Sequence, residues 1–239
     1  MVLLKDLFTT LATGEFSNLS FSAELAGNTI GASHRKIVDH LNLGLIELYK
    51  RFRFLEGELR LHVDPRVTMY YLREDRLASI ENISLTRYIE RPSDYEGFLN
   101  ILELTGVFKE TGEEIKLNNR QSVPSIRQLA PDVLKIAGLT EAQTLEIVYQ
   151  ASPTKVVLDD ETDLTTAVLA IPETIIEPLL FYMAFRVYKP VGANNSTAQA
   201  DKSASYQQQY ELSCQKLAQF GLDLHDNDQE ERFTSDGWV

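Results

Sequence analysis

Residues 171–188 constrain this fold most, because they read as an α-helix with no polar face. The run I-P-E-T-I-I-E-P-L-L-F-Y-M-A-F-R-V-Y starts with a proline in its first turn, where the missing N–H would be unpaired anyway. Apolar side chains then occupy every side of the helix, so we expect it to be buried among other elements and bent at Pro178. A membrane span would need about 20 residues without charges. Because Glu177 and Arg186 bracket only eight residues, we favour a buried helix.

A second, polar helix is predicted directly after a Pro-Val-Gly turn. The short polar side chains of residues 194–197 can cap its start, and Gly221 suits its end. Tyr206 and Tyr210 recur at helical spacing within a narrow apolar seam, whereas the neighbouring glutamines fall outside it. Packing on the preceding helix is the simplest role for most of this seam. Both tyrosines are also candidates for contacts with another subunit.

Size and charge limit what the chain can do. Its 239 residues can bury one core plus a smaller module, and 44% hydrophobic residues is ordinary for a globular protein. A net charge of −12 argues against tight binding to a nucleic-acid backbone. The single cysteine, Cys214, excludes an internal disulfide. The first residues lack an apolar run of secretory length, so we expect a short amphipathic helix there and no signal peptide.

The periodicity of the chain changes twice. Apolar residues recur at helical spacing over residues 34–55, and Ser33 is expected to cap this helix. Beyond Gly57 the period becomes two, and residues 59–63 and 67–72 predict a β-hairpin.

More strands follow in the middle of the chain. Residues 98–108 run into a glycine-bearing turn and return through residues 115–117, which predicts a second hairpin. Further short strands are expected at residues 133–136 and 145–150. The region 73–97 is charged and irregular, and one helical turn is expected near residues 75–80.

These patterns predict an α+β fold that is mainly helical. We expect a helical bundle with an inserted small antiparallel β module and an extended C-terminal tail, because no repeated βα alternation indicates a parallel sheet. The expected parts are listed in chain order: N-terminal helices in residues 1–56, a β-rich module in 57–157, a C-terminal helix pair packing with the N-terminal helices in 158–221, and an acidic extended tail in 222–239.

No catalytic constellation passes a check of spacing. His34 and His40 are six residues apart, which on a helix separates them by about 120° and prevents them from sharing a metal ion. The acidic run at residues 159–163 resembles a calcium loop, but Leu164 stands where glycine is needed, so an acidic linker fits better. We therefore expect no enzyme activity, no metal and no cofactor.

Two charged regions instead suggest contacts between subunits. Arg51 and Arg53 belong to the only concentration of positive charge, and acids interleaved with it make a nucleic-acid patch the weaker interpretation. A contact with an acidic neighbouring subunit fits better. The tail carries six acids and one arginine over residues 223–236, together with the aromatic anchors Phe233 and Trp238. The alternative is a frayed terminus with incidental aromatics.

The order of these segments resembles the head-to-tail connector, or adaptor, proteins of tailed bacteriophages, especially the short-tailed ones. The resemblance covers most of the chain. It rests on four stretches, in order: the amphipathic helix 37–53, the hairpin F-L-N-I-L-E-L-T-G-V-F-K-E-T-G-E-E-I-K-L-N-N, the later strand T-L-E-I-V-Y-Q-A, and I-P-E with its two following helices. The last stretch is the most specific.

The resemblance implies a virion protein of the phage neck without enzyme activity, present in the host cytoplasm during assembly. Such a protein forms a homo-oligomeric ring of about twelve copies that joins the portal protein to the tail tube or nozzle protein. Genomic DNA would pass through its lumen without specific binding, and no membrane is involved. It also implies that C-terminal segments reach toward the portal, which would give Phe233 and Trp238 a receiving surface.

A protein of another class is the alternative interpretation of this sequence. A soluble ligand-binding protein or hydrolase could bring Glu103, Glu146 and Asp163 together only on folding.

Overall fold

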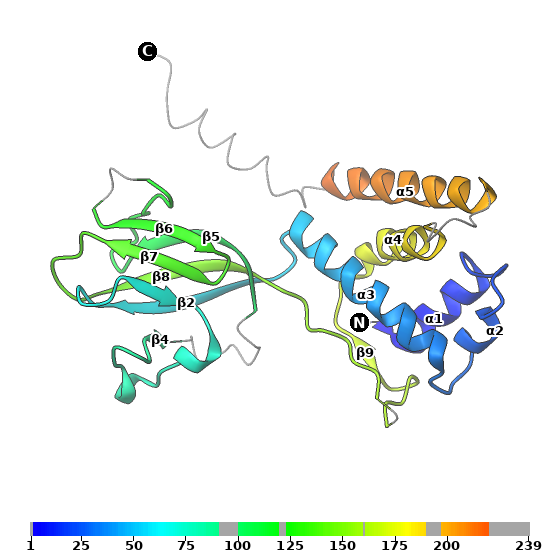
Figure 1. The fold of residues 1–239 in the computed structure, drawn as a ribbon, viewed down its shortest axis with the longest axis horizontal. Helices are drawn as coiled ribbons and strands as arrows, with labels where there is room; N and C mark the ends of the chain where they lie inside the picture. Colours follow the sequence, from blue (N-terminus) through cyan, green and yellow to red (C-terminus); the bar gives the residue numbers. More distant parts are fainter. Residues whose placement is uncertain (1, 91–99, 120–122, 160, 190–196, 220–239) are drawn as a thin grey trace, which may run out of the picture. The chain divides into compact units, whose positions relative to one another are not determined.

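The computed structural model describes residues 2–90, 100–119, 123–159, 161–189 and 197–219 (Figure 1). The chain divides into two compact units. A helical unit comprises Met1–Phe52 with Lys155–Val239, and a β unit comprises Arg53–Thr154. The β unit is thus inserted between two segments that fold together.

The helical unit contains the α-helices of the described residues and two strands of two residues each. In chain order its elements are β1 (Val2–Leu3), α1 (Leu4–Thr13), α2 (Ser22–Leu25), α3 (Ala32–Arg51), β9 (Val168–Leu169), the 3₁₀ turn η3 (Glu173–Ile175), α4 (Ile176–Tyr188) and α5 (Thr197–Leu217). β1 and β9 form a small antiparallel pair. Figure 1 shows α4 between α3 and α5.

Helix α4 is the centre of this unit, as its apolar sequence predicts. Every residue from 178 to 188 is buried or half-buried, and Leu179, Met183 and Ala184 are completely covered. Pro178 lies in the first turn of α4, directly after the 3₁₀ turn, where a missing N–H removes no bond within the α-helix. The regular helix therefore begins beside this proline instead of running through it.

The start of α3 is capped differently from the sequence prediction. Ser33 is the second residue of the helix, and Gly31 occupies the N-cap without a side-chain bond. The carboxylate of Glu24 accepts hydrogen bonds from the Ser33 backbone N–H at 3.1 Å and from its hydroxyl at 2.6 Å. The prediction that Ser33 caps the helix is wrong, because the carboxylate of Glu24 in α2 accepts a hydrogen bond from the Ser33 N–H instead.

The β unit consists of two antiparallel sheets on one core. One sheet has the order β4-β2-β8-β5 and the other β3-β7-β6. Their bounds are β2 (Glu56–Val63), β3 (Met69–Tyr71), β4 (Ile89–Glu90), β5 (Ile101–Lys109), β6 (Ser125–Ala130), β7 (Val133–Ala137) and β8 (Gln143–Ala151), with 3₁₀ turns η1 (Glu74–Arg76) and η2 (Ile80–Asn82). Inward side chains of both sheets, including Leu61, Ile147, Leu134 and Ile126, meet in a single hydrophobic cluster.

The strands predicted at 59–63, 67–72, 133–136 and 145–150 all exist, but their pairing differs. β2 and β3 do not form a hairpin, because β2 lies between β4 and β8 whereas β3 pairs with β7. After β5 the chain turns at Gly112 and returns antiparallel to the end of β5, with a bridge between Phe108 and Glu114 and a backbone hydrogen bond of 2.7 Å from the Ile115 N–H to the Val107 oxygen. Ile115 fills the core at 5% exposure. The prediction of the first hairpin is therefore wrong in its pairing partner, whereas the second hairpin exists as a short antiparallel return.

The mixed α+β class is confirmed. The mainly helical character is not, because the strands build a unit with its own core. Within the described part of the chain, no helix is both long and apolar enough to span a bilayer. The predicted tail, residues 222–239, lies outside the described residues.

Candidate functional site

The aromatic seam of α5 packs on α4 within the same chain. Tyr206 stacks on Tyr188 with ring centroids 5.6 Å apart and an interplanar angle of 18°. One turn further, Tyr210 meets the ring of Tyr182 edge to face at 5.4 Å. About one turn before Tyr206, the small side chain of Ser203 is buried and its hydroxyl donates to the backbone oxygen of Phe185 at 3.2 Å. This packing is the role that the sequence favoured for most of the seam.

The seam is also fastened to the loop after α1. The hydroxyl of Tyr188 donates to the backbone oxygen of Glu15 at 2.9 Å, and that of Tyr206 reaches the same oxygen at 3.5 Å. Burial raises the pKa of both tyrosines. The two hydroxyls therefore act as hydrogen-bond donors that join three segments far apart in the sequence.

Arg51, at the C-terminal end of α3, makes its ion pair inside the chain. Its Nη1 lies 2.8 Å from Oε2 of Glu211 on α5, and its guanidinium lies 5.9 Å from the ring centre of Tyr210. Tyr210 is only 5% exposed, and burial raises its pKa above the usual value. Neither side chain is therefore fully available to a second subunit, although a third of Arg51 remains exposed.

The other candidate interface residues have different surroundings. Arg53 lies at the beginning of the β unit, and its Nε is 3.7 Å from Oε1 of Glu56, with both side chains exposed. Phe233 and Trp238 lie outside the described residues. The interface roles of Arg51, Arg53, Tyr206, Tyr210, Phe233 and Trp238 thus remain predictions.

His34 has a structural role. Its ring is completely buried, packs edge to face on Phe8 at 5.1 Å, accepts a hydrogen bond from the Gly31 N–H at Nδ1 and donates from Nε2 to the Leu25 oxygen. Among the described residues no three potential ligands group together as a metal site would require. In the acidic run, Asp159 and Asp163 accept hydrogen bonds from nearby threonines, which lowers the pKa of both carboxyls.

Two of the carboxylates considered for a hydrolase, Glu103 and Glu146, lie on neighbouring strands but are not register partners. Glu103 is opposite Gln150 and Glu146 is opposite Phe108 in the β5–β8 ladder, while Asp163 belongs to the helical unit. The β unit does contain a hollow of about 520 Å³ beside Tyr70 and Tyr88. Its polar lining is self-paired, because His62 contacts Glu90 and Thr144, and Arg66 contacts Asp64. This geometry gives no support to a catalytic carboxylate pair.

The outward face of the four-stranded sheet is acidic. Alternation along β2 turns Leu59 and Leu61 inward and Glu58 and Arg60 outward, and the register places the outward residues of β8 and β5 beside them. The glutamates on this face are Glu56, Glu58, Glu90, Glu103 and Glu146. Arg60 is the one arginine among its strand residues, and it lies 3.7 Å from Glu146.

The outward face of the three-stranded sheet has the opposite character. Arg127 on β6 and Lys135 on β7 are register partners, and Met69 on β3 continues the same row. Leu129 and Tyr71 lie on this sheet at 53% and 37% exposure. In the described structure, neither cation forms an ion pair with a carboxylate. Along β2, β6 and β7, outward charged residues alternate with inward apolar ones, and this alternation indicates both faces in the sequence. The two faces are not among the sequence-based predictions.

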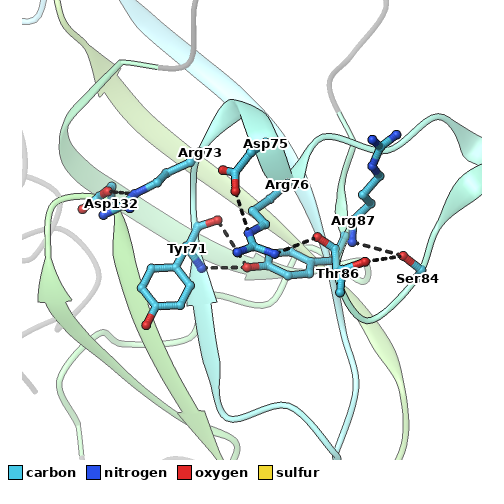
Figure 2. A network of polar contacts seen from close by, with 9 residues as sticks. Tyr71, Arg73, Asp75, Arg76, Ser84, Thr86, Arg87 and Asp132 are labelled. Carbon is cyan, nitrogen blue, oxygen red and sulfur yellow. Dashed lines mark hydrogen bonds and ion pairs between the residues drawn. The ribbon is translucent and has the colours of Figure 1, made fainter.

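A polar network supports one edge of this second face (Figure 2). Arg73 donates to Asp132 at 2.6 Å, and its guanidinium lies 5.4 Å from the ring centre of Tyr71. The Tyr71 N–H donates to the hydroxyl of Tyr88 at 2.8 Å, which holds the strand end in place. Figure 2 shows the Tyr71 ring turned away from these bonds, so that it stays on the outward face.

Comparison with known proteins identifies the family of the chain. A family model described as SU10 adaptor protein matches residues 16–235, which cover both units. A search among curated proteins found no match. The chain therefore belongs to the SU10 adaptor protein family, a family of phage head-to-tail adaptors.

Proposed function

We propose that this protein forms a homo-oligomeric ring in the neck of a short-tailed bacteriophage, where it joins the portal to the tail. The ring is dodecameric, and the viral genome passes through its lumen without specific binding. The family match over residues 16–235 is the observation that carries this proposal. The protein acts as a structural part, in the virion and in the host cytoplasm during assembly.

The two units of the structure have different surface properties, which supports a scaffolding role. The aromatic seam of the helical unit is packed internally between α4 and α5, and α3 packs on α4. The β unit instead exposes two sheet faces of unlike charge, which can be covered by other subunits. A net charge of −12 suits a DNA conduit, because repulsion lets the genome slide without adhering.

We propose the acidic tail, residues 222–239, as the segment that docks on the portal. Phe233 and Trp238 supply the bulky anchors that dominate interfaces. Removing residues 222–239 should abolish attachment to purified portal rings, because the anchors are lost, while the melting temperature stays unchanged. Replacing only Phe233 and Trp238 with alanine in the full-length chain should cause the same loss, which separates the two anchors from the rest of the tail. Attachment of the truncated protein with undiminished affinity would contradict the tail assignment.

A further inference from the structure

The β unit carries two outward faces of opposite charge on the two sides of one core. The acidic face, defined by Glu56, Glu58, Glu90, Glu103 and Glu146, belongs to the sheet β4-β2-β8-β5. The basic face, defined by Met69, Tyr71, Arg127, Leu129 and Lys135, belongs to the sheet β3-β7-β6. Because both sheets turn their apolar side chains into the same cluster, the two faces point away from each other.

The two positive charges of the basic face are not neutralised by other described residues. Arg127 and Lys135 lie directly opposite each other in the β6–β7 ladder, and like charges in this arrangement repel. Their charges are not balanced by an ion pair with any described carboxylate. Asp132, at the edge of the face, already pairs with Arg73 (Figure 2). An acidic surface placed over this row would remove the repulsion.

The basic face also has the composition of an interface core. Leu129 is 53% exposed and Tyr71 is 37% exposed, and Met69 on the same sheet is half-buried. Tyrosine, methionine and arginine are enriched at protein interfaces relative to the rest of the surface. The acidic face offers apolar area in return, since Val148 and Phe108 are half-buried among its glutamates.

We infer that the basic face of one β unit docks on the acidic face of the β unit in the next copy of this chain. Two different faces on opposite sides of one unit define a head-to-tail contact, and such a contact closes into a ring when the rotation between copies is right. Electrostatic complementarity sets the orientation of neighbouring copies and disfavours contacts between like faces. This inference rests on the proposed ring and names the surfaces that build it.

Reversing the charge of one face tests the contact. The basic-face variant carries Arg127→Glu and Lys135→Glu, and the acidic-face variant carries Glu58→Lys and Glu103→Lys. None of these four side chains has an ion pair among the described residues that the change would break. Each variant alone should associate at least about tenfold more weakly than the wild type, because like faces then meet. Association is measured by sedimentation with portal rings from the same phage.

Mixing the two variants is the decisive part of this experiment, because it tests whether the two faces contact each other. In an alternating ring every contact joins opposite charges again, so the mixture should assemble although neither variant does so alone. The matched controls reverse exposed charges away from both faces, Lys116→Glu and Glu141→Lys, and should assemble normally. Thermal melting establishes that each variant folds. A variant that unfolds is replaced by its single substitutions, Lys135→Glu or Glu58→Lys.

The outcomes separate this inference from the proposed ring. Normal assembly of both single-face variants, or failure of the mixture to recover, would overturn the assignment of the faces while the ring itself stands. Loss of assembly in the basic-face variant only would mean that an acidic tail or another protein covers that face, which also overturns it. A wild type that stays monomeric with and without portal rings would contradict the ring itself.

Discussion

Asn42 of α3 and Val156, which are 114 residues apart, exchange two hydrogen bonds. The side-chain amide of Asn42 donates to the Val156 oxygen at 2.9 Å, and its oxygen accepts from the Val156 N–H at 2.8 Å. Asn42 is only 8% exposed. The pair fixes the position at which the chain re-enters the helical unit after the β unit.

We expect Asn42→Ala to lower the free energy of unfolding by about 1–3 kcal/mol, because both backbone groups of Val156 lose a buried partner. Asn42→Asp should be at least as damaging, since a carboxylate cannot donate to the Val156 oxygen. Denaturant titration measures both changes. Asn100→Ala, at an exposed position in the β unit, controls for a general effect of removing an asparagine. Wild-type stability in both Asn42 variants would refute this role.

Tyr188 and Tyr206 provide a second test of the helical unit. Tyr206→Ala should destabilise the fold by about 3 kcal/mol, because it removes a half-buried aromatic ring stacked on Tyr188. Tyr206→Phe should cost less than about 1 kcal/mol, since its hydroxyl makes only a long bond of 3.5 Å to the Glu15 oxygen. The two melting curves distinguish ring packing from hydrogen bonding. Equal losses in both variants would assign the effect to the hydroxyl.

Arg51 and Arg53 have different partners, so their roles can be tested separately. Arg51→Glu should lower the melting temperature, because it places a carboxylate beside Glu211 where a 2.8 Å ion pair stood. The charge swap with Glu211→Arg should restore most of that loss, which amounts to about 1 kcal/mol for a half-exposed pair. Melting curves of the single and double variants measure this. If Arg51→Glu left the melting temperature unchanged, the ion pair would be irrelevant to the fold.

Arg53→Glu should instead leave the fold intact, since its contact with Glu56 is exposed and 3.7 Å long. If Arg53 contacts a neighbouring subunit, the same change should weaken assembly at least about tenfold. Lys50→Glu, an exposed charge at the end of α3, is the matched control. Assembly at wild-type strength would remove Arg53 from the subunit interface.

His34 makes the stability of the helical unit depend on pH. Burial lowers the pKa of its imidazole, and the neutral ring accepts the Gly31 N–H. Because the folded pKa lies below the unfolded value of about 6.5, this contribution is complete above that pH and is lost as the pH falls below it. An NMR titration should place the His34 midpoint below about 6.5. A midpoint above that value would contradict the neutral, accepting ring.

The helices could be predicted well because their signal is local. The period of 3.6 identified α3 and α4, and the all-round apolar character of residues 178–188 correctly indicated burial. The ends were less accurate, since α3 stops at Arg51 instead of continuing to Leu55. A helix end depends on which tertiary contacts follow, and Phe52 is already a completely buried residue outside the helix.

The pairing of the strands could not be predicted from the sequence, because it depends on contacts that are not local. A period of two reports which face a residue occupies, not which strand lies beside it, so β2 and β3 were assigned to one hairpin although they belong to different sheets. β6 was missed because Gln128 interrupts its apolar positions. The partner of Arg51, Glu211, is 160 residues away and could not be found from spacing. The outward charges of Arg127 and Lys135 were visible in the sequence, but their opposition depends on register.

The mass of the complex that this protein forms with portal rings of the same phage tests whether it assembles into a ring. Native mass measurement or particle imaging should show one closed ring of this protein on each portal, and the mass of the ring should be a whole multiple of the chain mass of 27.1 kDa. We expect a dodecamer. A protein that remains monomeric beside the portal, or that binds it as scattered single copies without ring closure, would contradict it.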